Sequence, residues 1–393
     1  MRCKNVRGRE HLPAPFSPLL EYPRTLCYHI PMTSFGILVI NPGSTSTKIA
    51  LFNGTEKLFE EDIIHAEDEL RGFGDIASQL SFRMRTLVQA LKERAVEPSK
   101  LAAVCVRGGL MRPVKSGVYR VTEDMVEDVR NSKNIWGREH ASSLGPLMGL
   151  QMSKEYGIPV FTADPVTVDE MDDIARISGV PEIKRRSLLH ALNIKERVRR
   201  GAHELGVKVA ETNFIAVHMG GGTTVAAIRR GRIADVNNAL LGQGPFSVQR
   251  AGALPTGDLL DVAYSGKYSK PELQRKLVYK SGMAGYLGTG DVREVERRID
   301  AGDGTAALIL SAMAYQVSKE IGGSAAALSG NVAAIILTGG VAFSERVTGM
   351  IKESVSFIAP VLVYPGQAEM EALAWYAEAA LSGKERILPY GQD

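Results

Sequence analysis

Residues 41–48 (NPGSTSTK) combine one glycine, four hydroxyl side chains and a lysine between two short apolar runs. Hydroxyls, backbone N–H groups and a Lys ammonium all donate hydrogen bonds, so this composition suits the binding of a phosphate. A Walker A loop would also need a glycine directly before the lysine, Ser or Thr after it, and a following helix. Because Thr47 precedes Lys48 and Ile49 follows it, the sequence predicts phosphate binding without the P-loop geometry.

Two further glycine sites occur later in the chain. Residues 219–224 (MGGGTT) follow an apolar run, and their glycines let backbone N–H groups approach an anion closely. Gly339 and Gly340 follow another apolar run and lead toward Ser344, where a helix is expected to start. Taken alone, this last pair is typical of an ordinary turn from a strand to a helix.

The elements that would position the first loop recur around the second. Apolar runs at 35–40 and 49–52 flank the first loop, Asn53-Gly54 is a hairpin signal, and a third strand is expected at 56–63. Runs at 214–218, 225–228 and 233–236, with a turn at 230–232, repeat this order. The repeat predicts a duplicated, two-lobed ATPase fold in which one hairpin from each lobe holds a polyphosphate.

Length and composition place the chain among ordinary globular proteins. Its 393 residues favour two domains, and 45% hydrophobic and 23% charged residues are typical of soluble proteins. No apolar run reaches the roughly 18 residues of a membrane helix. The net charge of +3 arises in residues 1–34, and the remaining 42 basic and 42 acidic residues balance, which gives no argument for nucleic-acid binding.

Residues 1–34 differ from the rest of the chain because they are basic and rich in proline. They lack the uninterrupted apolar stretch of a signal peptide, and Met32 stands just before the first expected strand. We expect a disordered tail or a start codon assigned too far upstream. Three cysteines without a CxxC spacing predict neither a disulfide framework nor a zinc site, which fits a reducing cytoplasm.

The motifs NPGSTSTK, VHMGGGTTVA and ILTGGVAF resemble those of the acetokinase family, in the superfamily of actin, sugar kinases and Hsp70. Stretches at 106–110, 137–145, 164–171, 185–193 and 237–255 resemble its butyrate kinase branch in particular. The likeness runs from about residue 35 to residue 375. It implies an α/β, duplicated, two-lobed actin-like ATPase (ribonuclease H-like) fold with mixed β-sheets flanked by helices. The expected domains are 35–165 plus 376–393, and 166–375.

The resemblance also implies an activity, the reversible transfer of the ATP γ-phosphoryl group to a short-chain fatty acid with Mg²⁺. Butyrate is the expected acid, and isobutyrate, propionate and acetate are alternatives; a non-catalytic actin-like ATP-binding regulator is an alternative of another class. A carboxylate is ionised at pH 7, so the nucleophile needs no general base but only charge cancellation and in-line placement. We expect a cytoplasmic homodimer or larger homo-oligomer, with no nucleic-acid or membrane partner.

Arg250, His190 and Asn41 are expected to be catalytic, and Arg107 and Arg250 are expected to bind the substrate. Arg250 stands where the family places an arginine between the substrate carboxylate and the γ-phosphate, which its planar fork suits. Acetate kinases have a motif like HRVVHGG where this chain reads AVCVRGG, so Val104 occupies the position of their arginine. Arg107 is the second candidate for binding the substrate, because it could supply the missing cation from the adjacent position; the alternative is a purely structural role. His190 matches a histidine that donates to the transferring phosphoryl group, although a lone histidine beside apolar residues is more often a core residue. Asn41 is a further donor to that phosphate.

Two carboxylates, Asp164 and Glu369, match those near Mg²⁺ in the family, and Asp164 is also expected to be catalytic. Glu369 opens an expected helix, where an acidic residue also favours the positive helix end. The expected ATP- and phosphate-binding residues are Ser44, Ser46, Lys48, His218, Gly220, Gly221, Gly222, Thr223, Gly339 and Gly340. The alternatives are a solvated strand residue for Lys48 and a backbone-capped residue at a strand end for His218.

Overall fold

The computed structural model describes residues 35–391, so the expectations for the segment 1–34 lie outside the described residues. The first sheet along the chain has seven strands in the order β12-β5-β6-β4-β1-β2-β3. Its strands β1, β2 and β3 form an antiparallel meander, and β4 and β6 add parallel to β1. The strands are β1 (Phe35–Pro42), β2 (Ser46–Asn53), β3 (Glu56–Ile64), β4 (Leu101–Arg107), β5 (Val118–Arg120), β6 (Val160–Ala163) and β12 (Ile387–Leu388).

A five-stranded sheet repeats this topology in the order β11-β10-β7-β8-β9. The antiparallel meander β7-β8-β9 corresponds to β1-β2-β3, and β10 and β11 add parallel to β7 as β4 and β6 do to β1. The strands are β7 (Asn213–Met219), β8 (Thr223–Arg229), β9 (Arg232–Val236), β10 (Ala334–Gly339) and β11 (Val361–Pro365).

The two meanders share local irregularities as well as order. Each second hairpin has two residues in its turn, and Gly54, Arg230 and Gly231 adopt positive φ angles of 61°, 50° and 81° there. The pairing register shifts at the same distance from both turns, between Leu51 and Phe52 and between Ala227 and Ile228. Tight turns of this kind favour left-handed conformations, which explains the glycines. The internal repeat expected from the sequence is therefore present.

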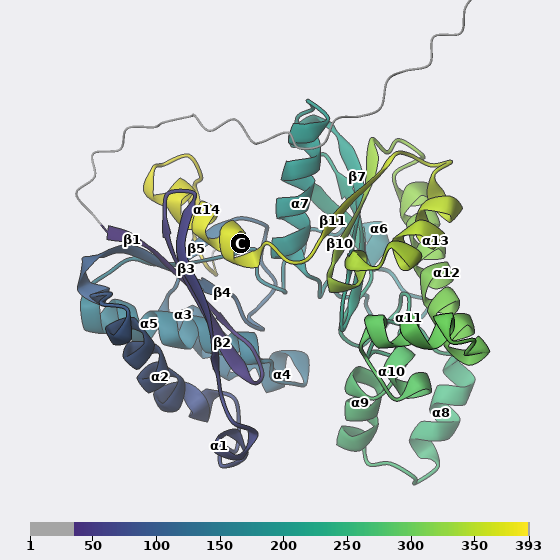
Figure 1. The fold of residues 1–393 in the computed structure, drawn as a ribbon, viewed down its shortest axis with the longest axis horizontal. Helices are drawn as coiled ribbons and strands as arrows, with labels where there is room; N and C mark the ends of the chain where they lie inside the picture. Colours follow the sequence, from purple (N-terminus) through teal and green to yellow (C-terminus); the bar gives the residue numbers. More distant parts are fainter. Residues whose placement is uncertain (1–34, 392–393) are drawn as a thin grey trace, which may run out of the picture. The chain divides into compact units, whose positions relative to one another are not determined.

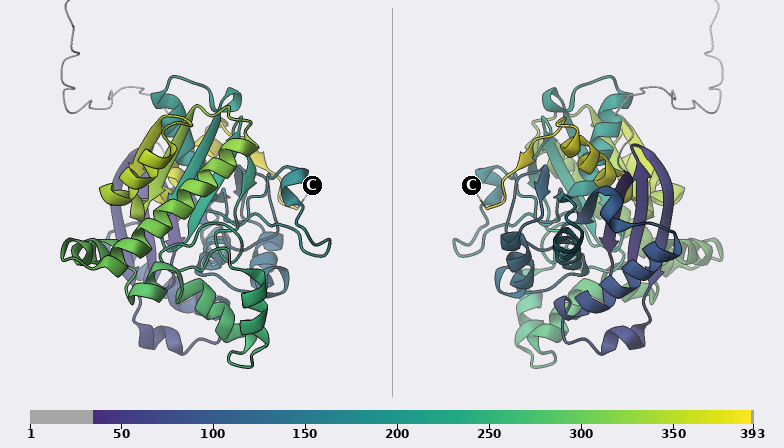
Figure 2. Two further views of the ribbon diagram at one scale, coloured as in Figure 1. Left: turned by 90° about the vertical axis from the view of Figure 1, so that its right-hand side faces the viewer. Right: turned by 90° about the vertical axis from the view of Figure 1, so that its left-hand side faces the viewer.

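Helices cover both faces of each sheet (Figures 1 and 2). One face of the first sheet packs on α2, α3 and α5, and the other packs on α14. In the second sheet, α12 and α13 cover one face and α7 covers the other. Leu192 of α7 joins the cluster formed by α14, so these two helices meet between the sheets. The bounds are α2 (Leu80–Glu93), α3 (Glu123–Arg130), α5 (Leu144–Tyr156), α7 (Ala191–Glu204), α12 (Gly304–Ala327), α13 (Glu345–Val355) and α14 (Glu369–Leu381).

The remaining helices lie in the connections. They are α1 (Glu67–Arg71), α4 (Ser132–Trp136), α6 (Asp173–Arg176), α8 (Thr256–Tyr264), α9 (Lys270–Tyr279), α10 (Gly282–Leu287), α11 (Val292–Asp300) and the 3₁₀ turns η1 (Ala77–Gln79), η2 (Pro98–Lys100), η3 (Ala141–Ser143), η4 (Val209–Glu211) and η5 (Gly340–Phe343). Within the described part of the chain, no helix combines the length and apolarity that crossing a bilayer requires.

Candidate active site

The hydroxyl-rich loop is the turn between β1 and β2, as expected. The Gly43 N–H donates to the Ser46 carbonyl at 2.8 Å, which closes the turn, and Ser44 is exposed. Lys48 lies on β2, and its Nζ forms ion pairs with Glu60 (3.3 Å) and Asp62 (3.1 Å) of β3. Its ammonium is therefore engaged by the neighbouring strand.

Glu369 gathers two other expected residues around one carboxylate. Its Oε2 accepts from Asn41 Nδ2 at 2.9 Å and from the Arg107 guanidinium. Asn41 comes from β1, Arg107 ends β4, and Glu369 opens α14, so three distant segments meet here. Glu369 is 4% exposed, and burial strengthens its attraction to the arginine.

Asp164 follows β6 with a φ of 39°, an unusual angle for a residue other than glycine. Its Oδ1 accepts from the Ser116 hydroxyl (2.7 Å) and the Gly117 N–H (2.9 Å), and its Oδ2 accepts from the Tyr376 hydroxyl (2.5 Å). Burial and the negative charge of Asp164 raise the pKa of Tyr376, which keeps the phenol protonated as a donor. Tyr376 lies on α14, two turns after Glu369.

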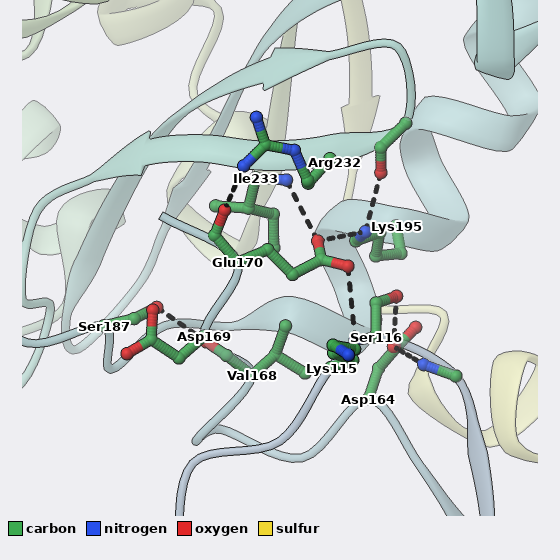
Figure 3. Close-up of polar contacts among 12 residues, drawn as sticks. Lys115, Ser116, Asp164, Val168, Asp169, Glu170, Ser187, Lys195, Arg232 and Ile233 are labelled. Carbon is green, nitrogen blue, oxygen red and sulfur yellow. Dashed lines mark hydrogen bonds and ion pairs between the residues drawn. The ribbon is translucent and has the colours of Figure 1, made fainter. Parts of the chain in front are cut away.

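The segment after Asp164 is held to the second sheet by Glu170, as Figure 3 shows. One carboxylate oxygen of Glu170 accepts from the Ser116 N–H at 3.3 Å. The other accepts from Lys195 Nζ (2.8 Å) on α7 and from the Ile233 N–H (3.0 Å) on β9. The crossing from the first sheet to the second is thereby fixed next to Asp164.

His190 and His218 form a stacked pair with ring centroids 3.9 Å apart and ring planes 12° from parallel. His190 Nδ1 lies 2.8 Å from Thr224 Oγ1, and His218 Nδ1 lies 2.9 Å from Asn193 Oδ1. Burial and the nearby arginines lower the pKa of His218 to about 3. Burial and the His218 ring hold the pKa of His190 well below its usual range, so both rings are neutral at pH 7.

Arg250 packs against the second glycine loop. Its guanidinium donates to the Ala239 carbonyl, and its backbone N–H donates to Ser247 Oγ at 3.1 Å. A Cβ added at Gly222 would lie 2.0 Å from Arg250 Nη1, so only glycine leaves room for this packing. Burial lowers the pKa of Arg250 to about 10, which leaves the guanidinium charged at neutral pH.

The loop itself offers free backbone donors. Gly220 donates to the Gly222 carbonyl at 3.0 Å, while the N–H groups of Gly221 and Gly222 donate to no hydrogen bond among the described residues. Thr223 is buried at the start of β8. The geometry is compatible with a bound anion.

The third glycine pair has a simpler explanation. Gly339 ends β10 with a φ of 91°, and an added Cβ would lie 2.2 Å from the Met219 carbonyl of the neighbouring β7. Close approach of two strands therefore requires this glycine. Gly340 starts η5 and has open space around an added Cβ. As expected, a helix follows, with Ser344 as the N-cap of α13.

A cavity of about 60 Å³ joins several of these residues. Its polar lining consists of Arg107, Arg250, His190 and His140. The remaining lining is apolar: Leu110, Val166, Leu188, Leu189, Ala239 and Leu240. Leu110, Leu188 and Leu240 belong to a separate small hydrophobic cluster together with Val278. The cavity lining thus combines cationic and aliphatic side chains.

Several residues of this site were not predicted individually, among them His140, Ser116 and Tyr376. His140 lies in the stretch GREHASSLG, whose likeness to the family could have identified it. Ser116 and Tyr376 carry no local motif and meet Asp164 only through tertiary folding, across 48 and 212 residues of sequence.

Comparison with known proteins decides the family. A sequence model of the acetokinase family matches residues 185–358. The chain is 49% identical to the probable butyrate kinase 2 of Caldanaerobacter subterraneus subsp. tengcongensis over 357 residues. The alignment covers 91% of this chain and 100% of that protein. The chain belongs to the acetokinase family. It is therefore an ATP-dependent carboxylate kinase.

Solved structures support the same fold. A propionate kinase from Francisella tularensis subsp. tularensis SCHU S4 aligns with a TM-score of 0.70 at 17% identity, over 87% of this chain and 98% of that one. An acetate kinase from Porphyromonas gingivalis aligns with a TM-score of 0.68 at 20% identity, again over 87% and 98%. The predicted duplicated, two-lobed actin-like ATPase fold with mixed sheets flanked by helices is confirmed.

Proposed function

We propose that the protein transfers the γ-phosphoryl group of ATP reversibly to the carboxylate of butyrate, with Mg²⁺ as cofactor, and forms butanoyl phosphate. The observation that carries this proposal is the cavity whose lining combines Arg107 and Arg250 with aliphatic side chains. The printed name of the relative that is 49% identical points to the same acid.

The two arginines suit the head of the acid. Each guanidinium has five N–H donors, and the described hydrogen bonds of both side chains use only Nη1, toward Glu369 in Arg107 and toward Ala239 in Arg250. The remaining N–H groups are available for the substrate carboxylate and the γ-phosphate. Their charges offset the repulsion between these two anions, which is the main barrier to bringing them together.

The cavity also suits the size of the acid. One ordered water needs roughly 10–15 Å³ on a comparable measure, so about 60 Å³ holds a small organic molecule of several heavy atoms. Leu110, Leu188 and Leu240 would remove the alkyl chain from water, at about 0.8 kcal/mol for each CH₂ group. A sugar would leave its hydroxyls unpaired against this wall.

The chemical step needs little from the protein beyond placement. A carboxylate oxygen forms a bond to the γ-phosphorus while the bond from that phosphorus to the β,γ-bridging oxygen breaks, and ADP takes up the electron pair. No proton is transferred from the nucleophile, because the carboxylate is already ionised. Arg250 and Asn41 are the proposed donors to the charge that spreads over the transferring group.

His190 is proposed to donate to the same group as a neutral imidazole. Thr224 Oγ1 accepts from the His190 backbone N–H at 3.3 Å, which leaves its hydroxyl proton free to bind the ring nitrogen Nδ1. The ring proton then resides on Nε2, the atom available to the cavity. His218 stacks behind this ring, and burial together with the His218 ring keeps the pKa of His190 low enough for a neutral imidazole.

The donor set around Asp164 and Glu369 fits Mg²⁺, which takes one or two carboxylates and completes its shell with phosphate oxygens and water. Glu369 Oε1 has no hydrogen-bond partner among the described residues, and Asp164 Oδ2 accepts only from Tyr376. Asp164 and Glu369 would hold the ion. When bound, it would neutralise phosphate charge. Ser116, Gly117, Tyr376 and Asn41 orient the two carboxylates.

The two loops are proposed to hold the polyphosphate from both sides, with Ser44 and Ser46 on one and Gly220 to Thr223 on the other. Gly339, Gly340 and His218 complete the proposed nucleotide contacts. The division into domains 35–165 plus 376–393 and 166–375 stays a prediction. So do assembly as a homodimer or larger homo-oligomer, a cytoplasmic location and the absence of nucleic-acid partners.

The alternative acids share this chemistry, because one methylene changes the preference by only about 1–3 kcal/mol. The regulator alternative is disfavoured by the two arginines that line this cavity together with aliphatic side chains, since nucleotide binding alone does not need them.

Trapping of acyl phosphate with hydroxylamine tests the class of the protein. With ATP, Mg²⁺ and butyrate we expect acyl hydroxamate to form in the same molar amount as ADP. No hydroxamate should form when the acid is omitted. ATP binding without hydroxamate from any short acid would overturn the kinase proposal in favour of a nucleotide-binding regulator.

A further inference from the structure

Arg83, on α2, is a buried arginine whose guanidinium binds the hydroxyl-rich loop. Its guanidinium donates to the carbonyl oxygens of Gly43 (3.1 Å), Ser44 (2.9 Å) and Ser46 (2.8 Å) and to Thr47 Oγ1 (3.0 Å). The side chain is 0% exposed. One residue, 36 or more positions away in sequence, therefore binds four acceptor atoms of the loop.

The positive charge of Arg83 has no carboxylate partner among residues 35–391. Its other N–H groups donate to the amide oxygen of Gln79, at 3.2 and 3.0 Å. Burial lowers its pKa to about 10, so the guanidinium still carries its charge at pH 7. Buried arginines are nearly always paired with an anion, because an unpaired buried charge is costly. Within this part of the chain, no anion therefore compensates the charge of Arg83.

The neighbouring histidine leaves the charge unaltered. His65 Nε2 lies 3.0 Å from Thr47 Oγ1, on the same side of the loop as Arg83. Burial and the charge of Arg83 lower the pKa of His65 to about 4, so its ring is neutral. The loop therefore rests on one cation and one neutral ring.

The carbonyl groups bound by Arg83 fix where the loop directs its N–H groups. In a trans peptide unit, C=O and N–H point in opposite directions. With the Gly43 and Ser44 carbonyls turned toward Arg83, the N–H groups of Ser44 and Thr45 point away from it. Neither N–H donates to a hydrogen bond among the described residues, and both residues are exposed. Two free N–H donors beside hydroxyls form an anion-binding arrangement.

We propose that Arg83 is a positioning residue that holds loop 43–47 in its phosphate-binding conformation and supplies the positive charge beneath it. The ligand class is the polyphosphate of a nucleoside triphosphate. The inference rests on the proposed function only in taking ATP as that nucleotide.

Calorimetric titration of ATP and of adenosine into four proteins tests the proposal: the wild type, Arg83→Met, Arg83→Lys and Arg85→Met. Arg85 lies on the same helix and is exposed, so its replacement is the matched control. We expect Arg83→Met to weaken ATP binding at least tenfold and to change adenosine binding less than twofold. Arg83→Lys keeps the charge but cannot reach four acceptors, so its ATP affinity should fall between the two. Arg85→Met should match the wild type.

Equal weakening of ATP and adenosine binding would overturn the proposal, because it would indicate general damage to the nucleotide site. Unchanged ATP affinity in folded Arg83→Met would overturn it too. If Arg83→Met does not fold, wild-type ATP affinity in Arg83→Lys would count against the role of the loop geometry. A wild type that binds ATP without forming acyl phosphate would refute the proposed function alone, since these titrations need no transfer.

Discussion

Replacing Gly222 by alanine should displace Arg250 without removing its charge. The added Cβ would lie 2.0 Å from Arg250 Nη1 and 2.6 Å from its Cζ, whereas ordinary contact begins at 3.4 Å. The guanidinium must therefore move by about 1.4 Å. Misplacement of a catalytic group by about 1 Å can lower the rate about 100-fold. We expect kcat/KM for butyrate to fall at least 100-fold, about 2.7 kcal/mol of transition-state stabilisation.

The fold should tolerate this change. Gly222 does not adopt a left-handed conformation, and the nearest atoms belong to the end of a flexible side chain, although the Ala239 carbonyl at 2.9 Å must shift slightly. The matched comparison within the same loop is Gly221→Ala, whose Cβ meets only the Gln249 side chain at 3.2 Å, so it alters the phosphate-binding loop without displacing Arg250. The assay is hydroxamate formation at varied butyrate, with thermal unfolding alongside. Wild-type kinetics in a folded Gly222→Ala protein would refute the reasoning about Arg250.

Three other changes have defined outcomes. Arg250→Ala should lower acyl-phosphate formation by orders of magnitude with little change in ATP affinity, and equal loss of both would point to misfolding. Leu240→Ala should enlarge the cavity and raise about tenfold the ratio of kcat/KM for the five-carbon acid to kcat/KM for butyrate. Leu241 lies outside the cavity lining, so Leu241→Ala should leave this ratio unchanged. Lowering the pH from 7 to 5.5 should reduce the free energy of unfolding by about 1 kcal/mol for each histidine whose pKa is lowered in the folded protein. The folded pKa values lie below the unfolded value near 6.5, so only the unfolded chain takes up protons in this range. Urea unfolding at both pH values measures this, and equal values would contradict it. The histidines concerned are His65, His140, His190 and His218.

The sequence predicted both meanders, because short apolar runs and turn residues are local signals. The run at 49–52 became β2 (Ser46–Asn53), and the run at 225–228 became β8 (Thr223–Arg229), so the strands extend into the predicted loops. Edge pairing with β12 was not predicted, since a two-residue strand has no periodicity to detect.

The site was less accessible to sequence reasoning. Asn41, Arg107 and Glu369 were each predicted, but their convergence on one carboxylate depends on how α14 packs. Arg83 and Tyr376 went unnoticed because an arginine or a tyrosine on an amphipathic helix usually faces solvent or the core. Only the fold shows that one supports a loop and the other a carboxylate.

The rate of acyl-hydroxamate formation across C2 to C5 acids, with ATP and Mg²⁺, tests the central claim most directly. The arginine-lined cavity with its leucine wall predicts a maximum of kcat/KM at butyrate. A maximum at acetate would contradict the proposed acid, and no product from any of these acids would contradict the proposed carboxylate kinase reaction.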